Sequence, residues 1–251
     1  MTTRRRRRRR TSAPAGQKAG AAGGGETAHP PSTETIEATP AHPAARGSRH
    51  ADAGTEPQEK FAALDLGTNN CRLLIASPRG RGFRIFDAFS RIVRLGEGVS
   101  TTGALSEDAM ARTLDALKVC ADKVARRGVV RMRCIATQAC RAASNGPEFL
   151  ARVERETGLK FEIIAPAEEA RLAVIGCGEL MDHDAPAGLI FDIGGGSTEI
   201  SWVRPRSENG RARTPEILAW TSLPLGVVNL SERHGGREMT REAYAALIEL
   251  L

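Results

Sequence analysis

Aromatic and large aliphatic residues are almost missing from the first sixty positions of the chain. Residues 1–60 contain no Phe, Trp or Tyr, and Ile36 is their one large aliphatic residue besides the initiator methionine. Such a segment cannot bury enough apolar surface to offset the entropy lost on ordering, so we expect a disordered, low-complexity tail. The remaining residues, about 190, are enough for one ordinary domain or two small ones.

Long apolar runs are also missing. No run approaches the roughly 18 residues that a membrane-spanning helix needs, and no apolar stretch follows the arginines Arg4–Arg10, as a secretory signal would require. We therefore expect a cytoplasmic protein without a membrane partner.

An excess of positive charge is confined to the tail. The formal net charge is +6, and Arg4–Arg10 alone supply seven positive charges, so the balance after residue 60 is close to neutral. This argues against a folded nucleic-acid-binding domain. The arginine run is either a solvated segment or a weak binder of polyanions.

Cysteine motifs are absent, although five cysteines are present. None belongs to a C-x-x-C pair, and no histidine stands at metal-ligand spacing from one. Most lie in apolar or helical stretches, where cysteine behaves as a small buried hydrophobe. The pattern argues against a zinc site or a cysteine nucleophile, and it fits a reducing compartment.

The first part of the remaining chain predicts an antiparallel meander. Residues 61–66, 72–76 and 83–89 are short apolar or alternating runs, separated by turn residues. Ser106 is a suitable N-cap for a helix whose apolar residues recur at spacings of three and four, and Gly128 is placed to end that helix.

Strands and helices then alternate. Residues 132–136 and 161–164 read as strands, and between them a helix opens at Asn145-Gly146-Pro147 and closes at Gly158. A further helix begins near Glu168 and runs to about Met181. Strands that alternate with helices after a meander indicate an α/β fold.

Two hairpins carry the same arrangement. Asp65-Leu66-Gly67-Thr68 and the segment from Asp192 to Thr198 (DIGGGST) each place an aspartate near the end of an apolar strand, followed by glycine and a hydroxyl residue in a tight turn. A second strand leads away from each turn. The second turn joins its strands in very few residues, so we expect a positive φ there and a glycine such as Gly195 to supply it. Glycines let backbone N–H groups approach an oxyanion, and a strand-end aspartate can hold Mg²⁺ directly or through water.

Two such turns, if they face each other, would clamp a phosphate chain from both sides. A dinucleotide site fits poorly, because the glycines do not follow the G-x-G-x-x-G spacing and no helix follows them. For each turn alone, an ordinary glycine-rich hairpin is the alternative.

At these residues the chain resembles the exopolyphosphatase/guanosine pentaphosphate phosphohydrolase (Ppx/GppA) family. FAALDLGTNNCRLLIA is similar to its first phosphate loop and LIFDIGGGSTEIS to its second. The resemblance continues through CIATQACRAASNGPEFL, IIAPAEEARLAVIG and SLPLGVVNLSER, and so covers nearly everything from Phe61 to about Gly235. The two loops alone would fit many actin-like kinases.

The resemblance implies a role for individual residues. Glu169 matches the family's proposed general base, Glu199 a second active-site carboxylate, and Arg141 the arginine of the T-x-x-x-R block, which suits phosphate oxygens. Asp65 and Asp192 match the acids associated with the metal, expected to be Mg²⁺. The residues that match the family's phosphate-binding loops are Gly67, Thr68, Asn69, Gly194, Gly195, Gly196, Ser197 and Thr198. The alternatives are a helix-dipole complement for Glu169, a solvated strand residue for Glu199 and a surface charge for Arg141.

The resemblance also implies an actin-like, ribonuclease-H-like α/β fold with two related domains around a cleft. We expect the tail at 1–60, the first domain at 61–172 and a partial second domain at 173–251, because the chain stops inside an apparent helix, Arg241 to Leu251.

The implied activity is water attack on a phosphoanhydride, which releases terminal phosphate from polyphosphate or guanosine pentaphosphate. The alternatives are a non-catalytic domain that binds polyphosphate or the alarmone, and an actin-like small-molecule kinase. A homodimer is left open.

Overall fold

The computed structural model describes residues 58–80, 82–182, 184–208, 211–234 and 240–250. Residues 1–57, which make up nearly all of the predicted tail, lie outside this part of the chain. Within the described ranges, no helix is long and apolar enough to cross a membrane.

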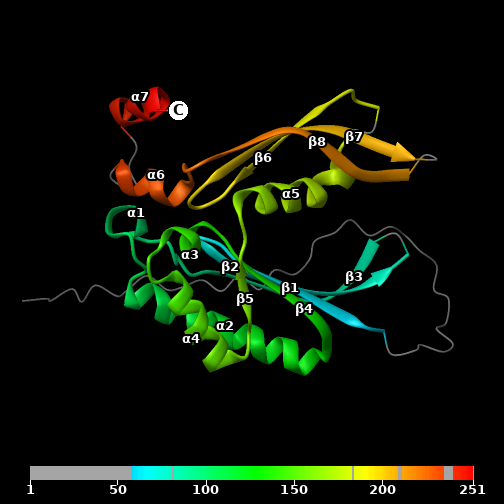
Figure 1. Cartoon of the computed structure of the whole chain (residues 1–251), viewed down its shortest axis with the longest axis horizontal. Coiled ribbons are helices and arrows are strands. Elements are labelled where there is room, and N and C mark those ends of the chain that lie inside the picture. The colour runs from blue at the N-terminus through cyan, green and yellow to red at the C-terminus, as the bar shows by residue number, and fades with distance from the viewer. Residues whose placement is uncertain (1–57, 81, 183, 209–210, 235–239, 251) are drawn as a thin grey trace, which may run out of the picture. The chain divides into compact units, whose positions relative to one another are not determined.

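The first sheet has five strands in the order β3-β2-β1-β4-β5 (Figure 1). β1 (Lys60–Leu66), β2 (Asn70–Arg79) and β3 (Gly82–Ile92) pair antiparallel, which confirms the predicted meander. β4 (Val129–Ala136) lies parallel to β1, and β5 (Phe161–Ile163) lies parallel to β4.

Two helices cover one face of this sheet. In α2 (Glu107–Arg127) the Ser106 hydroxyl accepts a hydrogen bond from the Ala109 amide at 3.2 Å, and Gly128 ends the helix in the left-handed region. α4 (Gly146–Thr157) packs beside α2 and ends at Gly158. Both helices begin and end where the sequence predicts. The largest buried side chains of the resulting core include Leu64, Leu66, Ile75, Leu95, Leu117, Phe149 and Val153.

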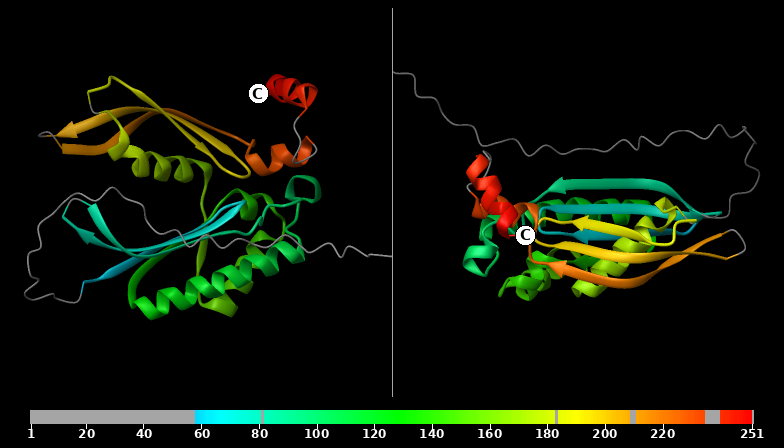
Figure 2. Two further views of the ribbon diagram at one scale, coloured as in Figure 1. Left: turned by 180° about the vertical axis from the view of Figure 1, so that it is seen from behind. Right: turned by 90° about the horizontal axis from the view of Figure 1, so that it is seen from above.

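The second sheet has three antiparallel strands in the order β6-β7-β8. These are β6 (Gly188–Ile193), β7 (Thr198–Glu208) and β8 (Arg211–Leu223). Helix α5 (Pro166–Cys177) runs along this sheet in both views of Figure 2 and contacts all three strands. It ends four residues before the predicted Met181, because the chain tightens into a 3₁₀ turn, η1 (Gly178–Leu180).

Four further helices are short or C-terminal. α1 (Val99–Thr102) and α3 (Gln138–Ala142) belong to loops of the first sheet, and α6 (Val227–Arg233) follows β8. α7 (Arg241–Leu250) agrees with the helix predicted from Arg241. The three short helices and β8 were not predicted.

The two hairpins are equivalent in register. Asp65 pairs with Arg72 across the β1–β2 hairpin, and Asp192 pairs with Glu199 across the β6–β7 hairpin. In each case one more residue pair separates the aspartate from the turn. The two aspartates therefore occupy the same position relative to their turns.

Candidate active site

A pocket of about 200 Å³ lies between the two hairpin turns. Its lining brings together most of the residues that the sequence singles out, from both hairpins and from the start of α5. These residues are Asp65, Gly67, Thr68, Asn69, Glu169, Asp192, Gly194, Gly195, Gly196 and Ser197. Residues far apart in the chain thus line one cavity with acidic groups, hydroxyls and glycine backbone.

The two turns approach each other closely at Gly195. A Cβ atom on this glycine would lie 3.0 Å from the Thr68 Cβ and 3.1 Å from the Asn69 backbone nitrogen. Sequence reasoning expected a glycine here because the turn would need φ > 0, and that expectation is wrong. Among the described residues, no glycine of this turn has a positive φ. The reason for glycine is the space between the turns.

The start of α6 holds the carbonyl groups of the second turn. The Val227 amide donates to the Gly194 carbonyl at 3.0 Å, the Val228 amide donates to the Gly195 carbonyl at 2.8 Å, and Asn229 Nδ2 donates to the Gly196 carbonyl at 2.9 Å. In a trans peptide the N–H of the next residue points opposite to the carbonyl.

The amides of Gly195, Gly196 and Ser197 therefore point away from α6. All three residues line the pocket, and within the described ranges these amides donate to no other protein group. Successive free N–H groups of this kind form an anion-binding nest.

The first turn is held in the same way by the segment after β3. The Thr68 carbonyl accepts a hydrogen bond from the Gly96 amide at 2.9 Å, and the Asn69 carbonyl accepts from the amides of Val93 at 2.9 Å and Arg94 at 3.0 Å. Arg94 adopts a left-handed conformation with φ 49°.

Glu169 presents a carboxylate with unusual proton affinity to the pocket. Its pKa is raised to about 7, mainly by burial and also by the charges of Glu199 and Asp192, while Arg141 acts in the opposite direction. Its neighbour Glu168 instead accepts hydrogen bonds from Arg171 and Arg133, which lower the pKa of that carboxyl to about 2. Of the two adjacent acids, only Glu169 is suited to exchange a proton near neutral pH.

Glu199 is almost fully buried, at 2% exposure. Its Oε1 accepts a hydrogen bond of 2.6 Å from the Ser222 hydroxyl on β8. It is therefore not a solvated strand residue. Glu199 does not line the cavity, but its charge contributes to the raised pKa of Glu169, which does.

Arg141 and Thr198 face protein partners. The Arg141 guanidinium donates to the Ile164 carbonyl at 2.6 Å, to Gln138 Oε1 at 2.7 Å and to Glu169 Oε2 at 3.4 Å. The Thr198 hydroxyl donates to the Leu225 carbonyl at 2.6 Å. Neither residue lines the pocket. The contacts with phosphate that we expect of these two residues stay predictions. In this structure the Arg141 guanidinium binds the Glu169 carboxylate and is itself fixed by Ile164 and Gln138.

Asp65 and Asp192 suit a hard divalent cation. Both line the pocket, and burial raises the pKa of Asp65, with Arg72 opposing this and the charge of Asp192 adding to it. Within the described ranges, no group of three or more His, Cys, Asp or Glu side chains is arranged to hold a metal ion. Mg²⁺ is commonly bound by one or two carboxylates together with water and substrate phosphates, so this pair fits it.

Four functional positions were missed at the sequence level. Gln138 lines the pocket, Ser222 holds Glu199, Asn229 holds the second turn, and Gly226 lies so close to Gly195 that a Cβ would overlap its backbone. All four stand in or beside the blocks TQACR and SLPLGVVN. Their individual roles depend on contacts between segments, which no local pattern shows.

Known proteins resemble this chain in sequence and in fold. The sequence model of the Ppx/GppA phosphatase family matches residues 74–247. Exopolyphosphatase 2 of Mycobacterium tuberculosis is 38% identical over 185 residues, which is 69% of this chain and 54% of that protein. The chain thus spans about half the length of the curated relatives it matches.

Solved structures agree. The Aquifex aeolicus member of the Ppx/GppA family superposes with a TM-score of 0.58 at 33% identity, covering 77% of this chain and 60% of that one. An exopolyphosphatase from Cytophaga hutchinsonii gives a TM-score of 0.67 at 28% identity, covering 76% and 58%. The predicted α/β fold is confirmed, and it is the fold of solved Ppx/GppA proteins. The chain belongs to the Ppx/GppA phosphatase family.

Proposed function

We propose that this protein hydrolyses terminal phosphoanhydride bonds, releasing orthophosphate from inorganic polyphosphate, guanosine pentaphosphate or both. The observation that carries the proposal is Glu169. Its carboxylate has a pKa of about 7 and opens onto a pocket lined by both hairpin turns, the second of which carries free amides. The exopolyphosphatase names of the relatives support polyphosphate as a substrate.

The turns would bind the terminal phosphate. The amides of Gly195, Gly196 and Ser197 supply donors on one side, and the first turn contributes Thr68 and Asn69 on the other. Preorganised donors of this kind stabilise charge that moves onto phosphoryl oxygens in the transition state. Because α6 and residues 93–96 already fix the turn carbonyls, the donors need little rearrangement on binding.

Glu169 would act as the general base. A water molecule attacks the terminal phosphorus, its proton passes to the Glu169 carboxylate, and the anhydride P–O bond breaks. The products are orthophosphate and a chain shorter by one phosphate. With a pKa of about 7, a large share of Glu169 is ionised at neutral pH and is still basic enough to accept the proton.

Mg²⁺ is the cofactor we propose. Asp65 and Asp192 would hold it, and when bound it neutralises charge on the phosphoryl oxygens. Arg141 keeps Glu169 in position through its own contacts with Ile164 and Gln138.

The test measures phosphate release from polyphosphate and from guanosine pentaphosphate, with and without Mg²⁺. Release that requires Mg²⁺ and is lost in Glu169→Gln supports the proposal. Saturable binding without turnover would overturn it and would identify a non-catalytic binding domain instead. Phosphate transfer to an added sugar or acetate acceptor, in place of release to water, would identify a kinase.

A further inference from the structure

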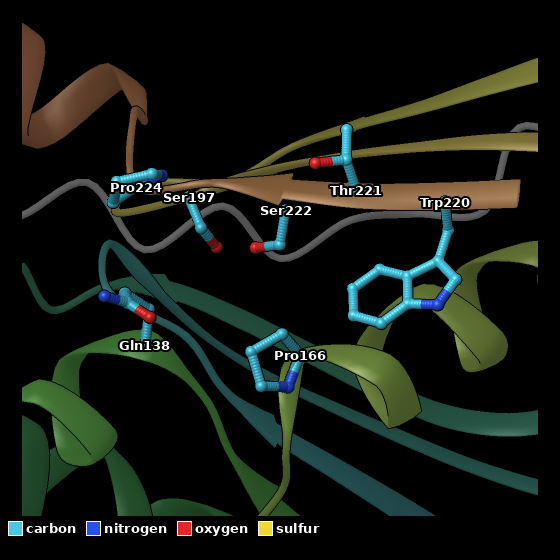
Figure 3. A pocket seen from close by; sticks show the side chains of 7 residues that line it. All are labelled: Gln138, Pro166, Ser197, Trp220, Thr221, Ser222 and Pro224. Atoms are coloured by element: carbon cyan, nitrogen blue, oxygen red, sulfur yellow. The ribbon is translucent and has the colours of Figure 1, made fainter.

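A second, larger pocket of about 450 Å³ opens beside the phosphate pocket. It lies between the end of β8 and the starts of α3 and α5 (Figure 3). Its lining consists of Gln138, Pro166, Ser197, Trp220, Thr221, Ser222 and Pro224. A volume of this size is within the range of small-molecule sites, about 300–1,000 Å³.

The two pockets share part of their walls. Gln138 and Ser197 line both of them. Pro166 stands three residues before Glu169 on α5, and Ser222 is bound to Glu199. A ligand whose terminal phosphate occupies the glycine turns can therefore continue directly into the second pocket.

The two pockets differ in charge. The phosphate pocket contains Asp65, Glu169, Asp192 and Arg72, whereas none of the residues that line the second pocket is ionisable. An extended phosphate chain carries a negative charge on each unit and needs cations or many free donors along its path. The second pocket is a poor continuation for such a chain.

The second pocket is lined by the flat apolar rings of a tryptophan and two prolines, where the phosphate pocket has charged side chains. In Figure 3 the Trp220 indole stands at one end of the pocket and Pro224 at the other, with the Pro166 ring between them. Trp220 is 44% exposed, although an indole of this size gains free energy from burial. Its side chain lies on the same side of β8 as that of Ser222, whereas the Thr221 side chain points to the other side.

We propose that this pocket binds the base of a nucleoside polyphosphate, with Trp220 as the stacking surface. The proposal rests on the proposed function, because it assumes that the phosphates of the same ligand lie in the glycine turns. Every nucleobase has a flat face that stacks on an aromatic ring, and base edges need donors and acceptors. In Figure 3 the Ser222 hydroxyl lies between the ring and the opposite end of the pocket, where the Ser197 hydroxyl and the Gln138 amide stand, so polar groups line the path from the glycine turns to the ring.

Trp220 fluorescence provides a test that does not require turnover. The chain has two tryptophans, and Trp202 lies on the opposite face of the sheet, because its strand partner Ala219 precedes Trp220. The variant Trp202→Phe leaves Trp220 as the reporter, and Trp220→Phe leaves Trp202 as the matched control. Each protein is titrated with guanosine 5′-tetraphosphate and with inorganic tetraphosphate, both in Mg²⁺.

The expected result is saturable quenching of Trp220 by the nucleoside tetraphosphate, with little change from the inorganic chain or in the Trp202 control. Trp220→Ala and the bulkier Trp220→Leu should weaken binding of the nucleoside ligand about 10- to 100-fold and leave inorganic tetraphosphate binding unchanged. Two non-aromatic variants are used so that a folding defect in one does not decide the outcome.

Equal quenching by the inorganic chain would overturn the inference, since the pocket would then hold phosphate. Unchanged nucleoside affinity in either folded variant would also overturn it. The inference and the proposed function fail separately. Base-specific quenching without phosphate release would count against hydrolysis alone, and polyphosphate hydrolysis without base-specific quenching would count against the Trp220 site alone.

Discussion

Two adjacent glutamates show how position decides chemistry at the level of single residues. Glu168 and Glu169 both stand in the first turn of α5, where an acidic side chain complements the helix dipole. Glu168 faces Arg133 and Arg171, which hold it ionised, whereas Glu169 is turned into the pocket towards Glu199. The sequence E-E contains no sign of this difference beyond the rotation of 100° per helical residue.

The first prediction concerns the base itself. Glu169→Gln should lower kcat by about 10²–10⁴, because the amide keeps the shape of the side chain but cannot accept the proton. Phosphate binding should be nearly unchanged, since the turn amides remain in place. Steady-state phosphate release and equilibrium binding of a non-hydrolysable polyphosphate analogue measure the two separately. Glu168→Gln is the matched control, and a variant at Glu169 that keeps a third of the wild-type kcat would contradict the assignment.

The second prediction concerns pH. Glu169 must be ionised to act as a base, and its pKa is raised to about 7, so it becomes protonated as the pH falls through this value. The rate should therefore decrease below pH 7, approaching tenfold per pH unit. Glu199 is one cause of the raised pKa, so Glu199→Gln should move this acidic limb to lower pH. A rate that stays flat from pH 8 to pH 5 would exclude Glu169 as the titrating group.

At the level of elements, the parts with local signals were predictable. The caps of α2, the glycine that ends α4 and the alternation of β1 to β3 act over a few residues, and the structure agrees with each. The glycine-rich turns and their aspartates were also found from sequence. β8, α6 and residues 93–96 were not, because β8 is placed by its pairing with β7, and α6 and residues 93–96 by hydrogen bonds to the turns.

The same distinction explains the error at Gly195. A local reading attributes a turn glycine to a positive φ, which is the usual reason within a hairpin. Here the constraint comes from Thr68 and Asn69, more than a hundred residues earlier in the chain. Likewise, the T-x-x-x-R block indicates Arg141, but only the fold shows that its guanidinium is held by Ile164, Gln138 and Glu169.

The third prediction follows from the turn contact. Gly195→Val should abolish binding of the polyphosphate analogue, because the added side chain would enter the space occupied by Thr68 and Asn69 and push the turns apart. Isothermal titration measures the loss, and circular dichroism checks that the variant is folded. Gly82→Val is the control, since a Cβ at that hairpin glycine meets nothing within 4 Å. Wild-type affinity in a folded Gly195→Val protein would show that this turn does not hold phosphate.

At the level of the whole molecule, the N-terminal residues contribute little that could pack. The fourth prediction is that removing residues 1–57 leaves the melting temperature and kcat unchanged, because this segment has a single large aliphatic residue after its first position. Weaker binding of long polyphosphate at low salt is the one expected change, from the loss of Arg4–Arg10. Thermal unfolding of the full-length and the shortened protein measures the effect. A melting temperature several degrees lower in the shortened protein would show that the segment packs.

The two turns are also connected through their supporting helices. Glu232 on α6 accepts hydrogen bonds from the Gly98 amide at 2.8 Å and from the Ser100 hydroxyl at 2.9 Å. α6 fixes the second turn, and the segment that leads to α1 fixes the first turn through Gly96. One exposed carboxylate thus joins the supports of both halves of the phosphate pocket.

The last prediction uses this link. Glu232→Ala should raise the KM for polyphosphate several-fold, because two hydrogen bonds to a charged acceptor are lost, each with a value of about 1 kcal/mol at an exposed site. The kcat should change less, because Glu169 and its partners belong to other elements. The melting temperature should change little, since the carboxylate lies outside the core. Glu154→Ala, at an exposed position on α4, is the control. If Glu232→Ala lowers kcat and leaves KM unchanged, the contact acts on the chemistry of Glu169 and does not hold the two turns together.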